Sequence, residues 1–324
     1  MGVIMQPVAS PRLPPFLALA FGILAVSTAA IFIRFAQVEA PSLVIAFYRL
    51  GLSALILAPI AWPRRQELKS LDRRTLALAG LSGLFLALHF ASWITSLELT
   101  TVASSVVLVT TTPLWVALLS PVFLKESLTR TVLLGLGLAL SGGLVVGLSD
   151  ACAWQGGLVC PSLPEMLGGQ AFWGDVLALF GAWMSAAYIM IGRSVRRRLS
   201  LVSYIFIVYG IAALVLLAQV WINRQPLIGY SPAVYGWFLL LAVIPQLLGH
   251  TIFNWALRYI SAAYVSVTLL GEPVGSTILA YFLLRETPTG VKLIGAILIL
   301  IGIFVASRGE TRRASAPPGD AIAG

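Results

Sequence analysis

The chain has 324 residues, of which 59% are hydrophobic and only 10% are charged, and its mean hydropathy is +0.96. A soluble domain of this size cannot bury that much apolar surface in one core, so an ordinary globular protein is excluded. The formal net charge of +9 suggests nucleic acid as a partner, but the basic residues lie between apolar stretches, as membrane orientation requires. The sequence therefore predicts an integral, multi-pass membrane protein that binds no nucleic acid.

Apolar stretches of about 20 residues recur along the chain, and each matches the thickness of a bilayer at about 1.5 Å per residue. They begin near Phe16, Leu43, Leu76, Val102, Val132, Phe172, Leu201, Tyr235, Ala262 and Val291. The first stretch is too long for a signal peptide and has too little charge before it. About ten transmembrane helices are therefore expected, and they are called spans 1 to 10 below.

Basic residues are distributed unevenly between alternate loops. With the N-terminus in the cytoplasm, the loops on that side hold most of the Lys and Arg residues, including the run RSVRRR at 193–198. The positive-inside rule then places both termini in the cytoplasm of a bacterial-type inner membrane. We interpret the basic run as an orientation anchor against anionic lipid. Five spans in each half would make the second half inverted relative to the first.

The two halves carry similar residues at an offset of about 160 positions. Pro113 falls on Pro273, Glu126 falls on Glu286, and with a slip of one residue His89 falls on His250. The repeated pattern indicates an internal duplication. The expected organisation is a disordered cytoplasmic tail at 1–14, a first repeat at 15–149, an extracytoplasmic linker at 150–170, a second repeat at 171–307 and a disordered cytoplasmic tail at 308–324.

The stretch 265–284 is long enough to span a bilayer and carries Glu272 and Pro273 at its middle. An acidic side chain at that depth costs roughly 2.5–3.5 kcal/mol, so it usually faces a polar cavity or a partner charge. Proline cannot donate to the helical ladder, so kinks are expected at Pro113 and Pro273. Two roles are open for Glu272. It either couples transport to protons, because burial favours a neutral carboxyl group, or it pairs with Arg49, which otherwise snorkels toward the surface.

Polar residues form stripes on two spans. His89 and Trp93 lie four positions apart in span 3, and Gln246, His250 and Asn254 follow at intervals of four in span 8. Residues at this spacing share one helical face, so both stripes are expected to point into the bundle. The alternative is hydrogen bonding between helices for packing alone. Together with nearby aromatic residues, the candidate substrate-binding residues are His89, Trp93, Trp183, Tyr188, Gln246, His250, Asn254, Tyr264 and Glu272.

Glycines mark spans 5 and 10 as closely packed helices. Gly143 and Gly147 are four apart in span 5, and Gly295 and Gly302 lie in span 10. Small residues at such spacings let helix backbones approach closely inside a membrane. The partner helix is expected either in the same chain or in a second copy, so a homodimer is one open possibility.

Motifs for enzymatic chemistry are absent from the sequence. It contains no HExxH, no G-x-S-x-G, no phosphate-binding loop and no Cys/His metal cluster, so no enzyme, cofactor or metal is expected. Cys152 and Cys160 lie in the outer linker, where a disulfide and two free thiols are both open.

Three segments carry a resemblance to a known family. FYRLGLSALIL in span 2, TTTPLWVALLSPVFLKESLT across span 4 and GEPVGSTILAYFLLRETPTGVKLIGAILILIGI across spans 9 and 10 resemble the EamA family of the drug/metabolite transporter superfamily. The resemblance covers residues 16–307 and implies a ten-helix inverted-repeat fold and export of small metabolites, with amino-acid exporters among the members. The residues that match the family pattern are Arg49, Pro113, Glu126, Glu272, Pro273 and Glu286.

The predicted fold class is an all-α membrane protein with ten transmembrane helices in two inverted five-helix repeats. Its expected function is secondary active transport, as an exporter of small metabolites such as amino acids, by alternating access around a midplane cavity. The expected partners are a small-molecule substrate and the lipid bilayer. The alternatives are a non-transporting membrane scaffold, a ligand receptor or a passive facilitator.

Overall fold

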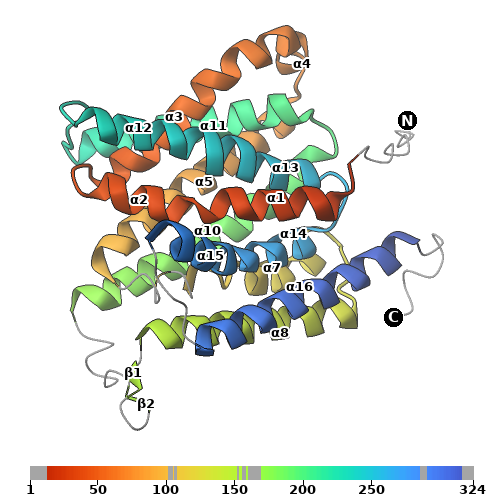
Figure 1. The fold of residues 1–324 in the computed structure, drawn as a ribbon. Helices are drawn as coiled ribbons and strands as arrows, with labels where there is room; N and C mark the ends of the chain where they lie inside the picture. Colours follow the sequence, from red (N-terminus) through yellow and green to blue (C-terminus); the bar gives the residue numbers. More distant parts are fainter. Residues whose placement is uncertain are drawn as a thin grey trace.

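The computed structural model describes residues 13–100, 105, 108–151, 153–154, 158–159, 169–284 and 290–315, and most of them are helical (Figure 1). The first half contains α1 (Pro15–Ser27) with α2 (Ala29–Gln37), α3 (Ser42–Ala61), α5 (Arg73–Leu99), α7 (Thr112–Phe123) and α8 (Arg130–Ala151). The second half contains α10 (Gln170–Arg196), α11 (Leu201–Ile222), α12 (Pro232–Leu241) with α13 (Thr251–Ala256), α14 (Ala262–Thr268) with α15 (Glu272–Leu284), and α16 (Gly290–Ser315). These helices follow the order of the predicted spans.

Short elements connect or interrupt these helices. They are a 3-10 turn at Trp62–Arg64, α4 at Arg65–Lys69, a π-helix at Ala242–His250, a 3-10 turn at Leu269–Gly271, and an antiparallel pair of strands, β1 (Ala153–Trp154) and β2 (Leu158–Val159). Among the described residues, 6 helical stretches are long and apolar enough to cross a membrane, and three shorter apolar helices accompany them. Cys152, Cys160 and Glu286 lie outside the described residues.

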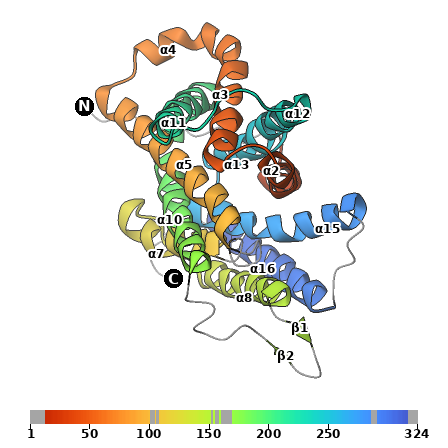
Figure 2. The ribbon, with the colours of Figure 1, turned by 90° about the vertical axis from the view of Figure 1, so that its left-hand side faces the viewer.

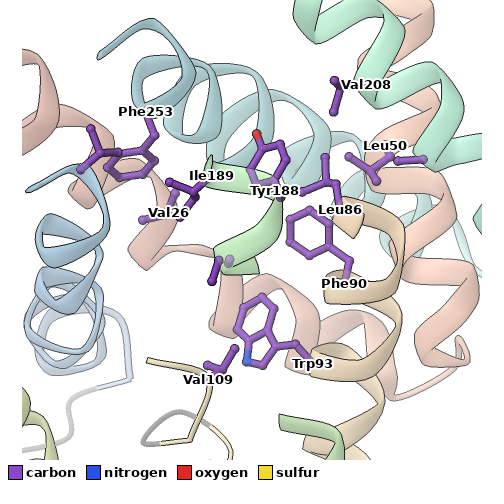
Figure 3. Packing of buried hydrophobic residues seen from close by; sticks show 14 of the residues in the cluster. Val26, Leu50, Leu86, Phe90, Trp93, Val109, Tyr188, Ile189, Val208 and Phe253 are labelled. Carbon is purple, nitrogen blue, oxygen red and sulfur yellow. The ribbon is translucent and has the colours of Figure 1, made fainter. Parts of the chain in front are cut away.

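The two halves of the chain pack into each other rather than side by side as separate bodies. The second-half helix α10 packs along α5 and α7, and α11 packs along α3 and α5, all from the first half (Figure 2). The buried apolar side chains therefore form one cluster that includes Phe90, Trp93, Tyr188 and Val208 (Figure 3). In Figure 1, α1 begins and α16 ends at the same end of the bundle.

Glycines bring α8 and α16 into backbone contact. A Cβ atom added at Gly135 would lie 2.5 Å from the carbonyl oxygen of Gly302, and one at Gly142 would lie 2.6 Å from that of Gly295. The close packing expected of Gly295 and Gly302 is thus made within one chain. Around Gly143 nothing lies within 4 Å of such an atom. The contacts of Gly295 and Gly302 are thus explained inside one molecule, whereas the close contact expected at Gly143 is not made within the described part of this chain, and a homodimer stays a prediction.

We expect Gly302→Ala to lower the melting temperature of the purified protein, because the added methyl group would lie 2.6 Å from the backbone nitrogen of Ala139. Overpacking of this kind costs about 1–3 kcal/mol. Gly143→Ala is the matched control, since it gains the same helix propensity and meets no neighbour. Thermal unfolding followed by size-exclusion chromatography compares the two variants. Equal melting temperatures of the two variants would argue against close packing between α8 and α16 at Gly302.

One predicted boundary is wrong. The tail expected to be disordered from residue 308 begins as a helix, because α16 continues to Ser315. Gly309 explains the extension, since it packs against the start of α8 so closely that an added Cβ atom would lie 2.8 Å from the hydroxyl of Thr129. The close packing between α8 and α16 therefore continues to Gly309, past the predicted end of the second repeat at residue 307.

Candidate functional site

A cavity of about 50 Å³ lies between helices of both halves. The residues in its wall that the sequence singled out are Arg49, His89, Trp93, Pro113, His250 and Glu272. The residues that were missed are Val26, Ala29, Val109, Thr110, Thr112, Ser185 and Leu269. Ligand pockets usually enclose about 300–1,000 Å³, so this cavity has room for only a few water molecules.

Arg49 lies wholly inside the bundle and does not snorkel to the surface. Its Nε donates to Oε1 of Gln246 at 2.8 Å, and its guanidinium carbon lies 4.1 Å from the ring centroid of Phe90. The second nitrogen, Nη1, is buried and has no hydrogen-bond partner. Within the described part of the chain no ion pair joins Arg49 to Glu272, although both line the cavity. The guanidinium group is therefore held in place while both N–H groups of Nη1 stay unused.

The two histidines lie on the same cavity. Nδ1 of His89 is 2.9 Å from the carbonyl oxygen of Gly181, so this nitrogen donates, and the ring stacks on Trp93 with centroids 6.0 Å apart. His250 meets the ring of Phe90 in a T-shaped contact at 5.4 Å. Among the described residues no group of three or more metal-binding side chains is found. Both histidines therefore contribute ring nitrogens to the cavity wall.

Both prolines predicted to kink a helix lie in the first turn of a helix that follows a break. After a turn at Thr110 and Thr111, α7 begins, and α15 begins at Glu272 directly after a 3-10 turn. The first helical turn needs no backbone N–H from proline, so Pro113 and Pro273 fit these positions well. The breaks bring polar groups to the cavity, because Thr110, Thr112, Pro113 and Glu272 all line it.

Glu272 is tied to α1 through its backbone rather than its carboxylate. Ser27 donates from Oγ to the carbonyl oxygen of Glu272 at 3.2 Å, and Ser276 donates to the carbonyl oxygen of Ser27 at 3.0 Å. Gly275 allows this approach, since a Cβ atom there would lie 2.1 Å from Oγ of Ser27. Neither contact uses the carboxyl oxygens, which leaves the acidic end of the side chain to the cavity.

The stripe predicted on span 8 is interrupted by a π-helix, but Gln246 and Asn254 are buried and His250 lines the cavity. The π-helix at Ala242–His250 has wider turns than an α-helix, so residues four apart no longer lie directly above one another. Gln246 contacts Arg49, His250 lines the cavity, and Asn254 donates to the hydroxyl of Tyr188 at 2.6 Å. Pro245, inside the π-helix, cannot donate to the ladder, which is a local cause of the irregularity.

Two aromatic residues predicted as cavity walls lie elsewhere. The side chain of Trp183 is 42% exposed and packs edge-on against Trp115 at 5.4 Å. Tyr264 is buried against Phe16, with ring centroids 5.5 Å apart. On α10 the cavity residue is Ser185, two positions from Trp183. Helical periodicity shows which residues share a face, but it does not show whether an aromatic face meets lipid or the bundle interior.

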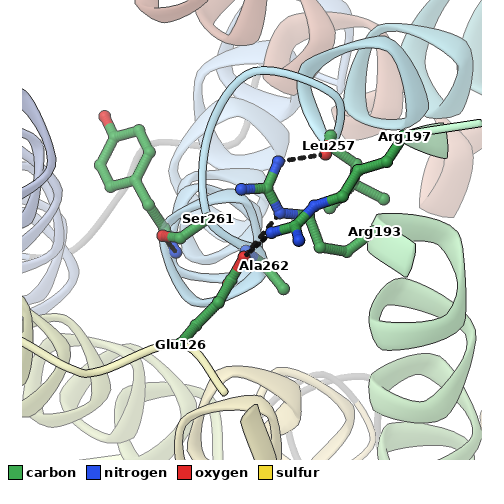
Figure 4. A network of polar contacts seen from close by, with 7 residues as sticks. Glu126, Arg193, Arg197, Leu257, Ser261 and Ala262 are labelled. Carbon is green, nitrogen blue, oxygen red and sulfur yellow. Dashed lines mark hydrogen bonds and ion pairs between the residues drawn. The ribbon is translucent and has the colours of Figure 1, made fainter. Parts of the chain in front are cut away.

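Glu126 forms a polar network at the end of α7 (Figure 4). Its Oε1 accepts from Nε of Arg193 at 2.7 Å and from Nη2 of Arg197 at 3.0 Å, and its Oε2 accepts from the backbone nitrogen of Ala262 at 3.3 Å. Lys125 has a left-handed backbone with φ of 53°, which turns the chain sharply before Glu126. The network joins the end of α7 to the end of α10 and the start of α14.

The basic run at 193–198 has internal partners. Arg196 is only 2% exposed and donates to the carbonyl oxygens of Asn254, at 3.0 Å, and Leu199. Arg193 and Arg197 pair with Glu126. Arg193 and Arg196 therefore hold helix ends together, whereas the side chain of Arg197 is 47% exposed, and the lipid anchor stays a prediction for the run.

Comparisons with known proteins agree with this architecture. An uncharacterized transporter of Archaeoglobus fulgidus is 24% identical over 283 residues, covering 85% of this chain and 91% of that protein. The uncharacterized transporter YyaM of Bacillus subtilis is 25% identical over 272 residues, covering 81% and 83%. A solved crystal structure matches with a TM-score of 0.72 at 20% identity, covering 93% of this chain and 99% of that chain, which shows a shared fold.

The family model described as the EamA-like transporter family matches the chain twice, at residues 13–148 and 172–308. Its members are membrane transporters of the drug/metabolite type, and the apolar helices are those of an integral, multi-pass membrane protein. Because the family model matches both halves and most of the length, the chain belongs to the EamA-like transporter family.

Proposed function

We propose that the protein is a secondary active transporter that exports small polar or zwitterionic metabolites, such as amino acids. The observation that carries this proposal is the cavity, which brings the fully buried Arg49 and the partly buried Glu272 into one wall in a chain of a transporter family. Charged groups inside a membrane protein are costly, and a membrane scaffold that transports nothing has little use for them. A zwitterionic molecule offers a partner to each.

The cavity fits a closed state of an alternating-access cycle. Its small volume leaves no room for a metabolite together with water, and the Glu126 network holds helix ends from both halves together. In such a cycle one end opens while the other stays closed, around a site near the bilayer centre. We propose that the segments 15–149 and 171–307 are the two inverted repeats that move. The distribution of basic residues supports cytoplasmic termini for this arrangement.

Transport by purified protein in liposomes tests the proposal. We expect saturable exchange of a radiolabelled neutral amino acid against the same unlabelled amino acid inside, and His250→Ala should lower its rate about tenfold through lost cavity contacts. Trp183→Phe is the control, because Trp183 lies outside the cavity. Binding without exchange would indicate a receptor or scaffold. If the amino acid only reaches equal concentrations on the two sides, and no ion gradient drives it further, the protein is a passive facilitator.

A further inference from the structure

Two hydrogen-bond donors in the cavity wall have no partner. They are Nη1 of Arg49 and Nε1 of Trp93, and both atoms are buried. The side chains are 0% and 5% exposed, so bulk water does not satisfy them. Folded proteins leave few buried donors unpaired, because each one forfeits its hydration. Two of them in the wall of one small cavity mark a place where a bound molecule can supply the acceptors.

The neighbours of these donors fix their positions. Gln246 and the ring of Phe90 hold the guanidinium group of Arg49, and His89 stacks on the indole of Trp93 with planes 10° apart. In Figure 3 the indole nitrogen of Trp93 is turned toward Val109, which also lines the cavity. Donors fixed in this way bind an acceptor group without further loss of side-chain freedom.

A carboxylate fits this pair of donors better than a neutral acceptor. It has two oxygens for two donors, and its charge balances a buried guanidinium group that no ion pair neutralises in the described residues. Glu272 in the same wall repels a second negative group. The cavity therefore suits a molecule with one carboxylate whose other end is neutral or positive.

We propose that Nη1 of Arg49 and Nε1 of Trp93 form a subsite for the single carboxylate of the transported molecule. This inference rests on the proposed transport function, because it assigns the substrate group that the same cavity holds. It gives the two side chains different tasks. Arg49 supplies the opposite charge, and Trp93 supplies a second, neutral donor that fixes the orientation of the carboxylate.

The test measures binding to the purified full-length protein by thermal stabilisation in detergent. The probes are L-alanine, L-leucine and L-phenylalanine, each compared with its primary amide, and propionate and L-aspartate. We expect the neutral amino acids to bind at least tenfold more tightly than their amides, and L-aspartate to bind weakly. A hydrogen bond to a charged group corresponds to about a tenfold change in affinity.

Trp93→Phe keeps an aromatic ring and removes the donor, so it should weaken binding of the acids about tenfold and leave the amides unchanged. Trp183→Phe, outside the cavity, should change neither. Equal binding of acids and amides, unchanged acid binding by a folded Trp93→Phe protein, or no acid binding at all would overturn the subsite. If Trp93→Phe fails to fold, the comparison of acids with amides on the unaltered protein decides.

Flux measurements with the same probes separate this inference from the transport proposal. Exchange of amides as fast as acids would overturn the carboxylate subsite and leave transport standing. Tight binding of the acids without any exchange would keep the subsite and overturn transport.

Discussion

Replacement of Glu272 by glutamine is expected to abolish the response of transport to an imposed pH gradient while substrate exchange continues. Glutamine keeps the size and the hydrogen-bonding ends of the side chain but cannot carry a proton. Glu272 lines the cavity in the first turn of α15, and in the described residues no ion pair holds its carboxylate. A carboxyl group without a fixed partner is free to take up a proton in one state of the cycle and release it in the other. Initial uptake rates into liposomes with and without the gradient give the result.

The control for this variant is Glu39→Gln, the same change at an exposed residue that caps Ser231 far along the chain. It should leave the response to the gradient unchanged. If Glu272 serves instead as a structural partner of Arg49, Glu272→Gln should lower the melting temperature, and Arg49→Met should partly restore it. A well-folded Glu272→Gln protein whose transport still follows the pH gradient would eliminate the coupling role.

The cavity residues that the sequence predicted are those whose burial in a membrane costs the most free energy. Arg49, His89, His250 and Glu272 stand out in apolar spans because a membrane tolerates such groups only where they face a cavity or a partner. Ser185, Thr110 and Thr112 were missed for the opposite reason. Small hydroxyl groups satisfy themselves against a backbone carbonyl, as Thr112 does against Val109 at 2.8 Å, so they are common at lipid-facing positions as well.

Other features of the site could not be predicted because they depend on an irregular helix or on contacts between distant parts of the chain. The intervals of four in span 8 assumed an α-helix, whereas Ala242–His250 is a π-helix, and Gln246, His250 and Asn254 meet different partners inside the bundle. The sequence did show its cause, since Pro245 lies inside that segment. Nothing in the neighbouring sequence predicted that Arg193 and Arg196 bind groups inside the bundle. It depends on Glu126 and Asn254, which lie far away in the chain and meet these arginines only in the folded bundle.

The second large effect is expected from Glu126→Gln, which should loosen the end of the bundle where α7, α10 and α14 meet. One buried carboxylate there accepts from two arginines and from the backbone nitrogen of Ala262. Without its charge, Arg193 and Arg197 lose their shared partner and repel each other. Charge-assisted hydrogen bonds are worth about 1.5–3 kcal/mol each, so the open state should gain roughly ten- to a hundredfold in population.

Thiol labelling of a cysteine in the cavity measures this shift. In a protein with Cys152 and Cys160 replaced by serine, Ser185→Cys places the thiol in the cavity wall, on the same helix that carries Arg193. Adding Glu126→Gln should raise the labelling rate by an impermeant reagent at least tenfold. Glu67→Gln is the matched control, because Glu67 accepts from Ser200 and Ser203 at the start of α11. Equal labelling rates with and without Glu126→Gln would show that the carboxylate does not hold the cavity closed at this end, and the closing contact would then have to be sought elsewhere in the bundle.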